Sequence, residues 1–290
     1  MTVQNTLTKT WTILKDATAH FGASDGWAMA SHIALSMIMA LFPFLIFTTS
    51  LAGFLGYEAQ SGAIVDLVFD TWPDDIANPI VREVNTVLAE RHAGFMSAAI
   101  LLAMFFASNG VEAVRAGLGR AYSAPSTKSF VKARLQSLVF VGCGAVLLLA
   151  MSFFMTFRPQ LFEMAVRSLP FLAKLEVPLV LLRFAMAIGV LLFAVFACHA
   201  WLPAGKGTIS EIWPGILVTL VLWVVCANIF TAYLHSFSDY GATFAGLAGI
   251  MVALVFLYLM AVILLIGGEL NAALAHAENP ARWEDDGSGN

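Results

Sequence analysis

Long apolar runs separated by short polar stretches dominate the pattern of hydrophobic and polar positions. Each run approaches or exceeds the roughly 20 residues that an α-helix needs to cross the hydrocarbon core of a bilayer. Only the fourth run contains a charged residue, Arg183. The pattern predicts an all-α, polytopic membrane protein with six transmembrane helices in one bundle, at about 27–57, 93–110, 136–157, 178–202, 212–235 and 243–268.

The segments outside the bundle predict further helices that lie at its ends. Residues 1–26 predict an amphipathic helix at the cytoplasmic membrane surface, with apolar positions Leu7, Trp11, Leu14 and Phe21. The loop after the first span predicts a second amphipathic helix, with apolar residues at Ile76, Ile80, Val84 and Leu88. Residues 269–290 are expected to form a cytoplasmic tail. Because the first apolar run is longer than a signal-peptide core of roughly 7 to 15 residues, we expect it to remain as an anchor.

Composition agrees with the membrane class, and the placement of basic residues predicts the orientation. Hydrophobic residues make up 60% of the chain and charged residues 12%. One set of tails and loops holds Lys9, Lys15, Arg115, Arg120, Lys128, Lys132, Arg134, Lys206 and Arg282. The loops on the opposite side hold fewer: Arg82, Arg91, Arg158, Arg167 and Lys174. By the positive-inside rule, both termini are expected in the cytoplasm.

Polar residues within the runs fall mostly at one depth, towards the cytoplasm. The candidates for substrate binding are His32, Ser36, Asn109, Glu112, Arg115, His199, Asn228 and Glu269. An isolated ionisable group in hydrocarbon costs roughly 2.5 to 3.5 kcal/mol, which is reduced if such groups face one another or a wet cavity. The alternatives are that these residues mark the water interface, and that Asn228 bonds to another helix.

Other residues in the runs are interpreted as anchors or as shapers of the helices. Arg183 is expected to extend to the outer-leaflet headgroups, or else to pair with a carboxylate such as Asp239. Pro43 and Pro214 lie inside runs, where membrane helices tolerate proline. Gly241 and Gly249 belong to a stripe of small residues that allows another helix to approach closely.

The predicted inner loop at 112–135 combines five basic residues with helical periodicity. Each cation near anionic lipid contributes about 1 kcal/mol of attraction to the membrane surface. The segment therefore indicates lipid contact, or it serves only to fix the topology. Nucleic-acid binding is a weaker interpretation, because only Tyr122 and Phe130 could stack on bases.

Several stretches resemble the YihY/BrkB family of bacterial inner-membrane proteins. They are HIALSMIMALFPFLIFTTSLAGFLG, VEAVRAGLGRAY, WLPAGKGTISEIWPGILVTLVLWVVCANIFTAYL and YGATFAGLAGIMVALVFLYLMAVILLIGGELNAAL, within residues 10–276. The resemblance implies six helices, cytoplasmic termini and a role in the cell envelope. Members often carry a Tyr-Tyr pair where this chain has Leu35 and Ser36, so a role of those tyrosines does not transfer.

The family has carried the label ribonuclease BN, a tRNA-processing enzyme, and the sequence argues against that activity. Metal-dependent cleavage of RNA needs convergent His and carboxylate ligands, and the six histidines form no such cluster. The GKGT stretch at 205–208 lacks the spacing of a phosphate-binding loop. No Ser-His-acid arrangement stands out. We therefore predict no enzymatic activity, no metal and no cofactor.

The leading functional hypothesis is ATP-independent transport of an envelope lipid or an amphipathic small molecule. Its expected partners are membrane lipids, and not nucleic acid. A non-transporting scaffold that binds envelope proteins, or a second copy of itself, through its loops is the alternative. An intramembrane enzyme is a third possibility, for which Glu112, Glu269 and His32 are the plausible groups.

Overall fold

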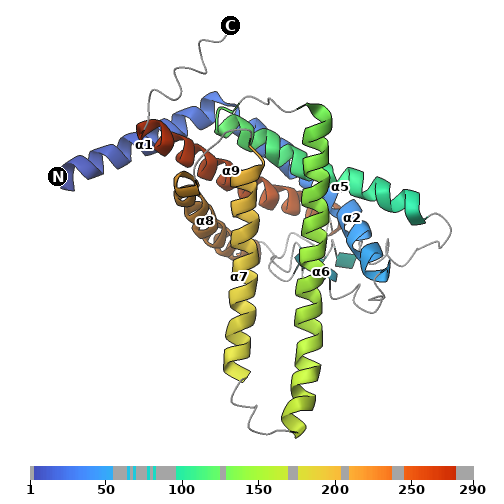
Figure 1. Ribbon diagram of the computed structural model, residues 1–290. Coiled ribbons are helices and arrows are strands. Elements are labelled where there is room, and N and C mark those ends of the chain that lie inside the picture. Colours follow the sequence, from blue (N-terminus) through green and yellow to red (C-terminus); the bar gives the residue numbers. More distant parts are fainter. Residues whose placement is uncertain are drawn as a thin grey trace.

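A computed structural model describes residues 3–54, 64–65, 68–69, 77–78, 81–82, 96–124, 129–168, 176–203, 209–236 and 245–278. The regular secondary structure of these residues is helical throughout. The helices are α1 (Val3–Ala23), α2 (Gly26–Phe54), α5 (Met96–Ala121), α6 (Phe130–Ser168), α7 (Glu176–Trp201), α8 (Ile209–Ser236) and α9 (Ala245–Glu278). In Figure 1 the chain forms one bundle, with α1 lying along α9 at its upper end.

The all-α membrane architecture predicted from the hydrophobic pattern is confirmed. Within the part of the chain that the structure describes, five stretches are long and apolar enough to cross a membrane: Gly26–Phe54, Ile100–Ala121, Phe130–Ser152, Ser210–Leu234 and Ile250–Ala277. The predicted fourth span falls on α7, whose described apolar part is Ala185–Trp201. Helices α2 and α8 continue through Pro43 and Pro214.

Three helices extend well beyond the limits that the sequence suggested. Helix α6 runs from Phe130 to Ser168 instead of over 136–157. Helix α5 continues to Ala121 instead of ending near residue 110, so Glu112 and Arg115 lie inside it. The Glu112 carboxylate pairs with Arg115 one turn later, and a paired charge does not end a helix. Most of the predicted loop at 112–135 is therefore helix. Helix α9 likewise runs on to Glu278, into the segment predicted as a tail.

Helix α1 packs on the bundle through a single apolar face. Ile13, Ala17 and Phe21 are buried and recur every four residues, which aligns them along one side of the helix. Trp11 and Leu14, which the sequence grouped with Phe21, are exposed instead. The Phe21 ring lies so close to Gly26 that a Cβ at position 26 would be 2.4 Å from it. This contact fixes the corner between α1 and α2.

Helices α8 and α9 approach each other closely at two glycines. A Cβ on Gly215 would lie 2.0 Å from the Gly267 carbonyl oxygen, and a Cβ on Gly267 would lie 2.1 Å from Thr219 Oγ1. Two glycines therefore allow the backbones to touch, as small residues do in membrane helix pairs. The predicted small-residue stripe is a different one: Ala253 in it is fully buried, whereas Gly241 and the surroundings of Gly249 lie outside the described residues.

Some predictions fall where the structure gives no description. The predicted helix around Ile80, Val84 and Leu88 lies mostly outside the described residues, as does Asp239. The side chain of Arg183 is also outside them, so its expected contact with headgroups stays a prediction.

Candidate functional site

Three groups of polar side chains lie towards the end of the bundle that carries α1. In Figure 1 the last turns of α5 and α7 and the first turns of α6 and α8 all lie in the upper part of the bundle. The first group connects α1 to α9, the second connects α5, α7, α8 and α9, and the third connects α5 to α6. Each is built from residues that are far apart in the sequence.

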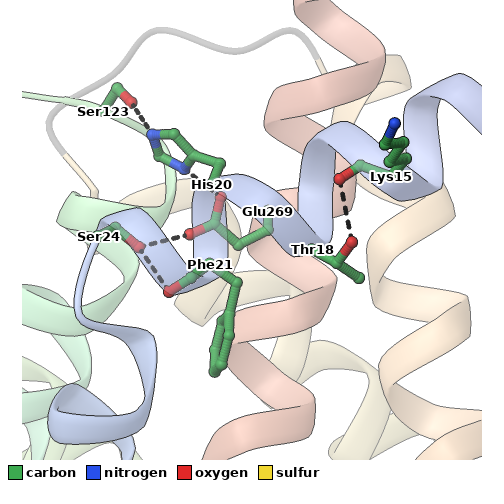
Figure 2. Close-up of polar contacts among 7 residues, drawn as sticks. All are labelled: Lys15, Thr18, His20, Phe21, Ser24, Ser123 and Glu269. Atoms are coloured by element: carbon green, nitrogen blue, oxygen red, sulfur yellow. Dashed lines mark hydrogen bonds and ion pairs between the residues drawn. The ribbon is translucent and has the colours of Figure 1, made fainter.

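The first group surrounds the carboxylate of Glu269 on α9. Its side chain is only 2% exposed, and His20 Nδ1 lies 2.5 Å from Oε2. Ser24 donates its hydroxyl to Oε1 at 3.0 Å, as Figure 2 shows. On the far side of the imidazole, Ser123 Oγ lies 3.1 Å from His20 Nε2. A buried carboxylate needs such partners, because an unpaired charge away from water is costly.

The second group centres on Asn271 of α9, which bonds to the backbone of α8 beside Pro214. Its Oδ1 accepts the Gly215 N–H at 2.6 Å, and its Nδ2 donates to the Ile212 carbonyl at 2.9 Å. The same Nδ2 donates to the hydroxyl of Tyr122 at 2.9 Å. The amide thus stabilises α8 next to a proline, which lacks the N–H that a helix uses there.

Tyr122 connects Asn271 to a residue of α7. Its hydroxyl lies 2.8 Å from Nδ1 of His199, a side chain that is 3% exposed. Burial raises the pKa of the Tyr122 hydroxyl well above its usual range, so the proton stays on the oxygen. The hydroxyl therefore accepts from Asn271 and is also hydrogen-bonded to His199 Nδ1. The second group is thus buried and bonded in series, which is typical of a structural contact.

Replacing Tyr122 by phenylalanine should destabilise the fold without removing any charge. His199 Nδ1 would lose its hydrogen-bond partner, and an amide N–H of Asn271 would lose an acceptor. We expect the free energy of unfolding to fall by about 1 to 3 kcal/mol, the cost of leaving buried polar groups unpaired. Thermal unfolding in detergent measures this. Ser31→Ala is the matched control, because Ser31 is exposed and donates only to its own helix at Trp27.

The third group is charged and partly open to the surroundings. Arg115 Nε donates to Glu112 Oε2 at 3.1 Å, and its Nη2 donates to Oε1. Ser137 on α6 donates to the same carboxylate at 2.9 Å. The side chains of Arg115 and Glu112 are 15% and 28% exposed, although both lie inside the candidate span Ile100–Ala121.

Arg134 adds a second cation to this group. Its Nη2 donates to the Phe105 carbonyl at 2.9 Å, and its guanidinium lies 3.8 Å from the centre of the Phe105 ring. Within the described residues, its buried Nε has no hydrogen-bond partner and no carboxylate lies within ion-pair distance. Since Glu112 is already paired with Arg115, the group carries a surplus of one positive charge.

The remaining candidates from the sequence do not join these groups. His32 and Asn109 are exposed and Ser36 is half-buried, and for none of the three does the described part of the chain show a side-chain hydrogen bond. Asn228 is exposed and donates to Val224 of its own helix, so the expected bond to another helix is wrong. The proposed trio of Glu112, Glu269 and His32 is not assembled, because each has different surroundings.

Sequence reasoning missed five residues that complete the groups. They are His20, Tyr122, Ser123, Arg134 and Ser137. Four of them lie in segments interpreted as a surface helix or a loop, where polar residues are common and do not suggest a site. One feature of the sequence could have indicated His20. It is next to Phe21, one of the apolar positions through which the N-terminal helix packs on the bundle.

Comparisons with known proteins identify relatives along most of the chain. A family model described as virulence factor BrkB matches residues 17–288. The chain is 25% identical over 264 residues to a protein of Bacillus subtilis named putative ribonuclease-like protein YfkH, covering 90% of this chain and 94% of the relative. It is 33% identical over 93 residues to a UPF0761 membrane protein of Vibrio atlanticus, covering 32% of this chain and 29% of that protein. No solved structure gives a significant match.

Proposed function

The chain belongs to the virulence factor BrkB family of membrane proteins, and we propose that it moves a phosphate-bearing lipid between the leaflets of the bacterial inner membrane. The movement uses no ATP hydrolysis. The word ribonuclease in the name of the Bacillus relative belongs to that protein, and we do not carry it over at 25% identity.

The observation that carries this proposal is the surplus positive charge beside Glu112. Arg134 lies at a junction of α5 and α6, next to a carboxylate whose charge Arg115 balances. Basic sites between membrane helices are suited to anionic headgroups. A phosphate oxygen can accept from a guanidinium in the same way as a carboxylate does.

The surface around Arg134 suits the rest of a lipid molecule. Large apolar side chains are exposed on the same two helices: Leu101, Leu102, Phe106, Leu135 and Val139. In a membrane these side chains contact acyl chains rather than water. The charged group and this surface together match a molecule with a phosphate at one end and hydrocarbon at the other.

The distribution of charge supports the orientation within this proposal. More Lys and Arg residues lie in the two tails and in the loops on the same side of the membrane than in the loops on the opposite side. This distribution favours cytoplasmic termini. The third group would then lie nearer the cytoplasmic leaflet, where anionic lipids attract cations. Headgroups entering from that leaflet would meet Arg134 first.

Reconstitution of the full chain tests the proposal. Vesicles of phosphatidylethanolamine and phosphatidylglycerol contain a fluorescent phosphatidylethanolamine, and dithionite quenches the outer leaflet, so later loss of fluorescence reports transfer from the inner leaflet. We expect transfer several times faster with the protein than without it, in the absence of any nucleotide. Equal rates with and without the protein would refute transport and favour the non-transporting scaffold.

A further inference from the structure

Ser123, His20 and Glu269 are hydrogen-bonded in series, and they come from three separate parts of the chain. We propose that they form a Ser-His-Glu triad that cleaves acyl esters at the membrane surface. Figure 2 shows the imidazole lying between the serine hydroxyl and the carboxylate. This inference goes beyond transport, and it departs from the absence of enzymatic activity that the sequence predicts.

The contacts follow the order that nucleophilic catalysis by serine requires. Glu269 Oε2 lies 2.5 Å from His20 Nδ1, so the carboxylate holds the proton of the neutral imidazole on Nδ1. His20 Nε2 is then an acceptor, and Ser123 Oγ lies 3.1 Å from it. That distance is within the range in which a base activates a serine.

Solvent exposure increases from the carboxylate to the serine, as a catalytic site of this kind requires. The Glu269 side chain is 2% exposed, the His20 side chain is 44% exposed, and Ser123 is exposed. The orienting carboxylate is thus shielded from water, whereas the hydroxyl is open to a substrate. Ser24 donates to the other carboxylate oxygen at 3.0 Å and so restrains the carboxylate from rotating.

The backbone at Ser123 is unusual for serine. Its φ of 48° lies in the left-handed region, at the end of α5, where glycine is the common residue. Its N–H donates to the Arg120 carbonyl and the Ala124 N–H to that of Gly119, which closes the helix end. Serine adopts this conformation only at some cost in free energy. A catalytic role of the hydroxyl would account for a serine at this position.

The place of the triad indicates the class of substrate. Phe21, the residue after His20 in the sequence, packs edge-on against Trp27 with ring centres 5.0 Å apart, and Trp27 is 57% exposed. Tryptophan prefers the headgroup level of a bilayer. The acyl ester carbonyls of a glycerolipid lie close to that level. We therefore infer that the substrate is an acyl ester of a membrane lipid.

The reaction balances without any redox partner. Ser123 Oγ forms a bond to the acyl carbon while its proton passes to His20 Nε2. The ester C–O bond then breaks, and the leaving alcohol takes the proton from His20. Water reverses these steps: it gives a proton to His20, attacks the acyl carbon and releases a carboxylic acid and the free serine. Because the N–H groups of residues 123 and 124 already bond to α5, turnover is expected to be slow.

A fluorophosphonate probe tests the triad on the purified full-length chain, since it reacts with an activated serine and needs no turnover. We expect labelling at Ser123, located by peptide mass spectrometry. Ser123→Ala and Ser123→Gly should both abolish it; the glycine variant suits the left-handed backbone and therefore folds. His20→Gln should slow labelling roughly 100-fold, the contribution of a general base.

Thr18→Ala is the matched control, because Thr18 is an exposed residue on the same helix as His20 and donates its hydroxyl to the Leu14 and Lys15 carbonyls of that helix. It should keep most of the labelling at Ser123. Absence of labelling in the wild-type chain, or equal labelling after Ser123→Gly, would overturn the triad. Either outcome leaves the lipid-transfer assay unaffected, so a failure of the triad and a failure of transport can be told apart.

Discussion

Gly215→Ala is expected to lower the free energy of unfolding by about 3 kcal/mol or more, which is the upper range for overpacking a core. The new methyl carbon would lie 2.0 Å from the Gly267 carbonyl oxygen and 2.5 Å from Asn271 Nδ2. Neither neighbour can move freely, because one is backbone and the other bonds to the Ile212 carbonyl. Helices α8 and α9 would have to separate.

Thermal unfolding in detergent, followed by size-exclusion chromatography, measures this loss. Gly144→Ala and Gly189→Ala are matched controls, since both glycines are helical and a Cβ at either would meet nothing within 4 Å. Replacing a helical glycine by alanine normally gains about 0.5 to 1 kcal/mol. A Gly215→Ala protein as stable as these two controls would show that the α8 and α9 backbones do not touch.

The hydrophobic pattern was sufficient to predict the helices, but not where a helix ends near charges. The polar residues from Asn109 to Arg115 suggested the end of the second span, and α5 instead continues to Ala121. Glu112 is neutralised by Arg115 within one turn and receives a hydrogen bond from Ser137 on another helix. Only the first of these two partners can be recognised from spacing.

The sequence suggested residues for a candidate site but not the directions in which their side chains point. A substrate site between the helices would need His32 to face inward, yet Ile33 and Ala34 are buried and His32 is exposed. Met29 and Ala30, also buried, precede these two by four residues and define the same face. That periodicity shows the inward side of α2, but small residues such as alanine mark a helix face weakly. The direction of His32 was therefore missed.

The partners of Glu269 could not be predicted, because they depend on how α1 folds back onto the bundle. His20 lies 249 positions from Glu269, and it comes near only because Phe21 packs against Gly26 at the corner before α2. Ser123 reaches the same imidazole from the end of α5. No spacing rule connects these three segments, so the Ser-His-Glu series was visible only in three dimensions.

Arg134→Gln should reduce lipid transfer by about tenfold or more. A headgroup phosphate that leaves water to cross the bilayer loses hydration, and a guanidinium compensates part of that loss. Hydrogen bonds to charged groups contribute about 1.5 to 3 kcal/mol, and each 1.4 kcal/mol is a factor of ten. Thermal unfolding in detergent checks that the packing of α5 on α6 persists after loss of the bond from Arg134 to the Phe105 carbonyl.

Lys132→Gln is the matched control, because it removes the same charge from the same turn of α6. Lys132 is exposed, and in the described residues it makes no contact with Glu112 or Arg115. A general effect of positive charge on membrane attachment would lower transfer equally in both variants. A site at Arg134 would affect only one of them.

The ratio of initial transfer rates in these two variants tests the central claim most directly. Both proteins are reconstituted at equal density in the same nucleotide-free vesicles, and transfer of the fluorescent phosphatidylethanolamine is followed after addition of dithionite. We predict that Lys132→Gln retains the wild-type rate and that Arg134→Gln is slower by about tenfold or more. Equal rates in the two variants would contradict a headgroup site at Arg134.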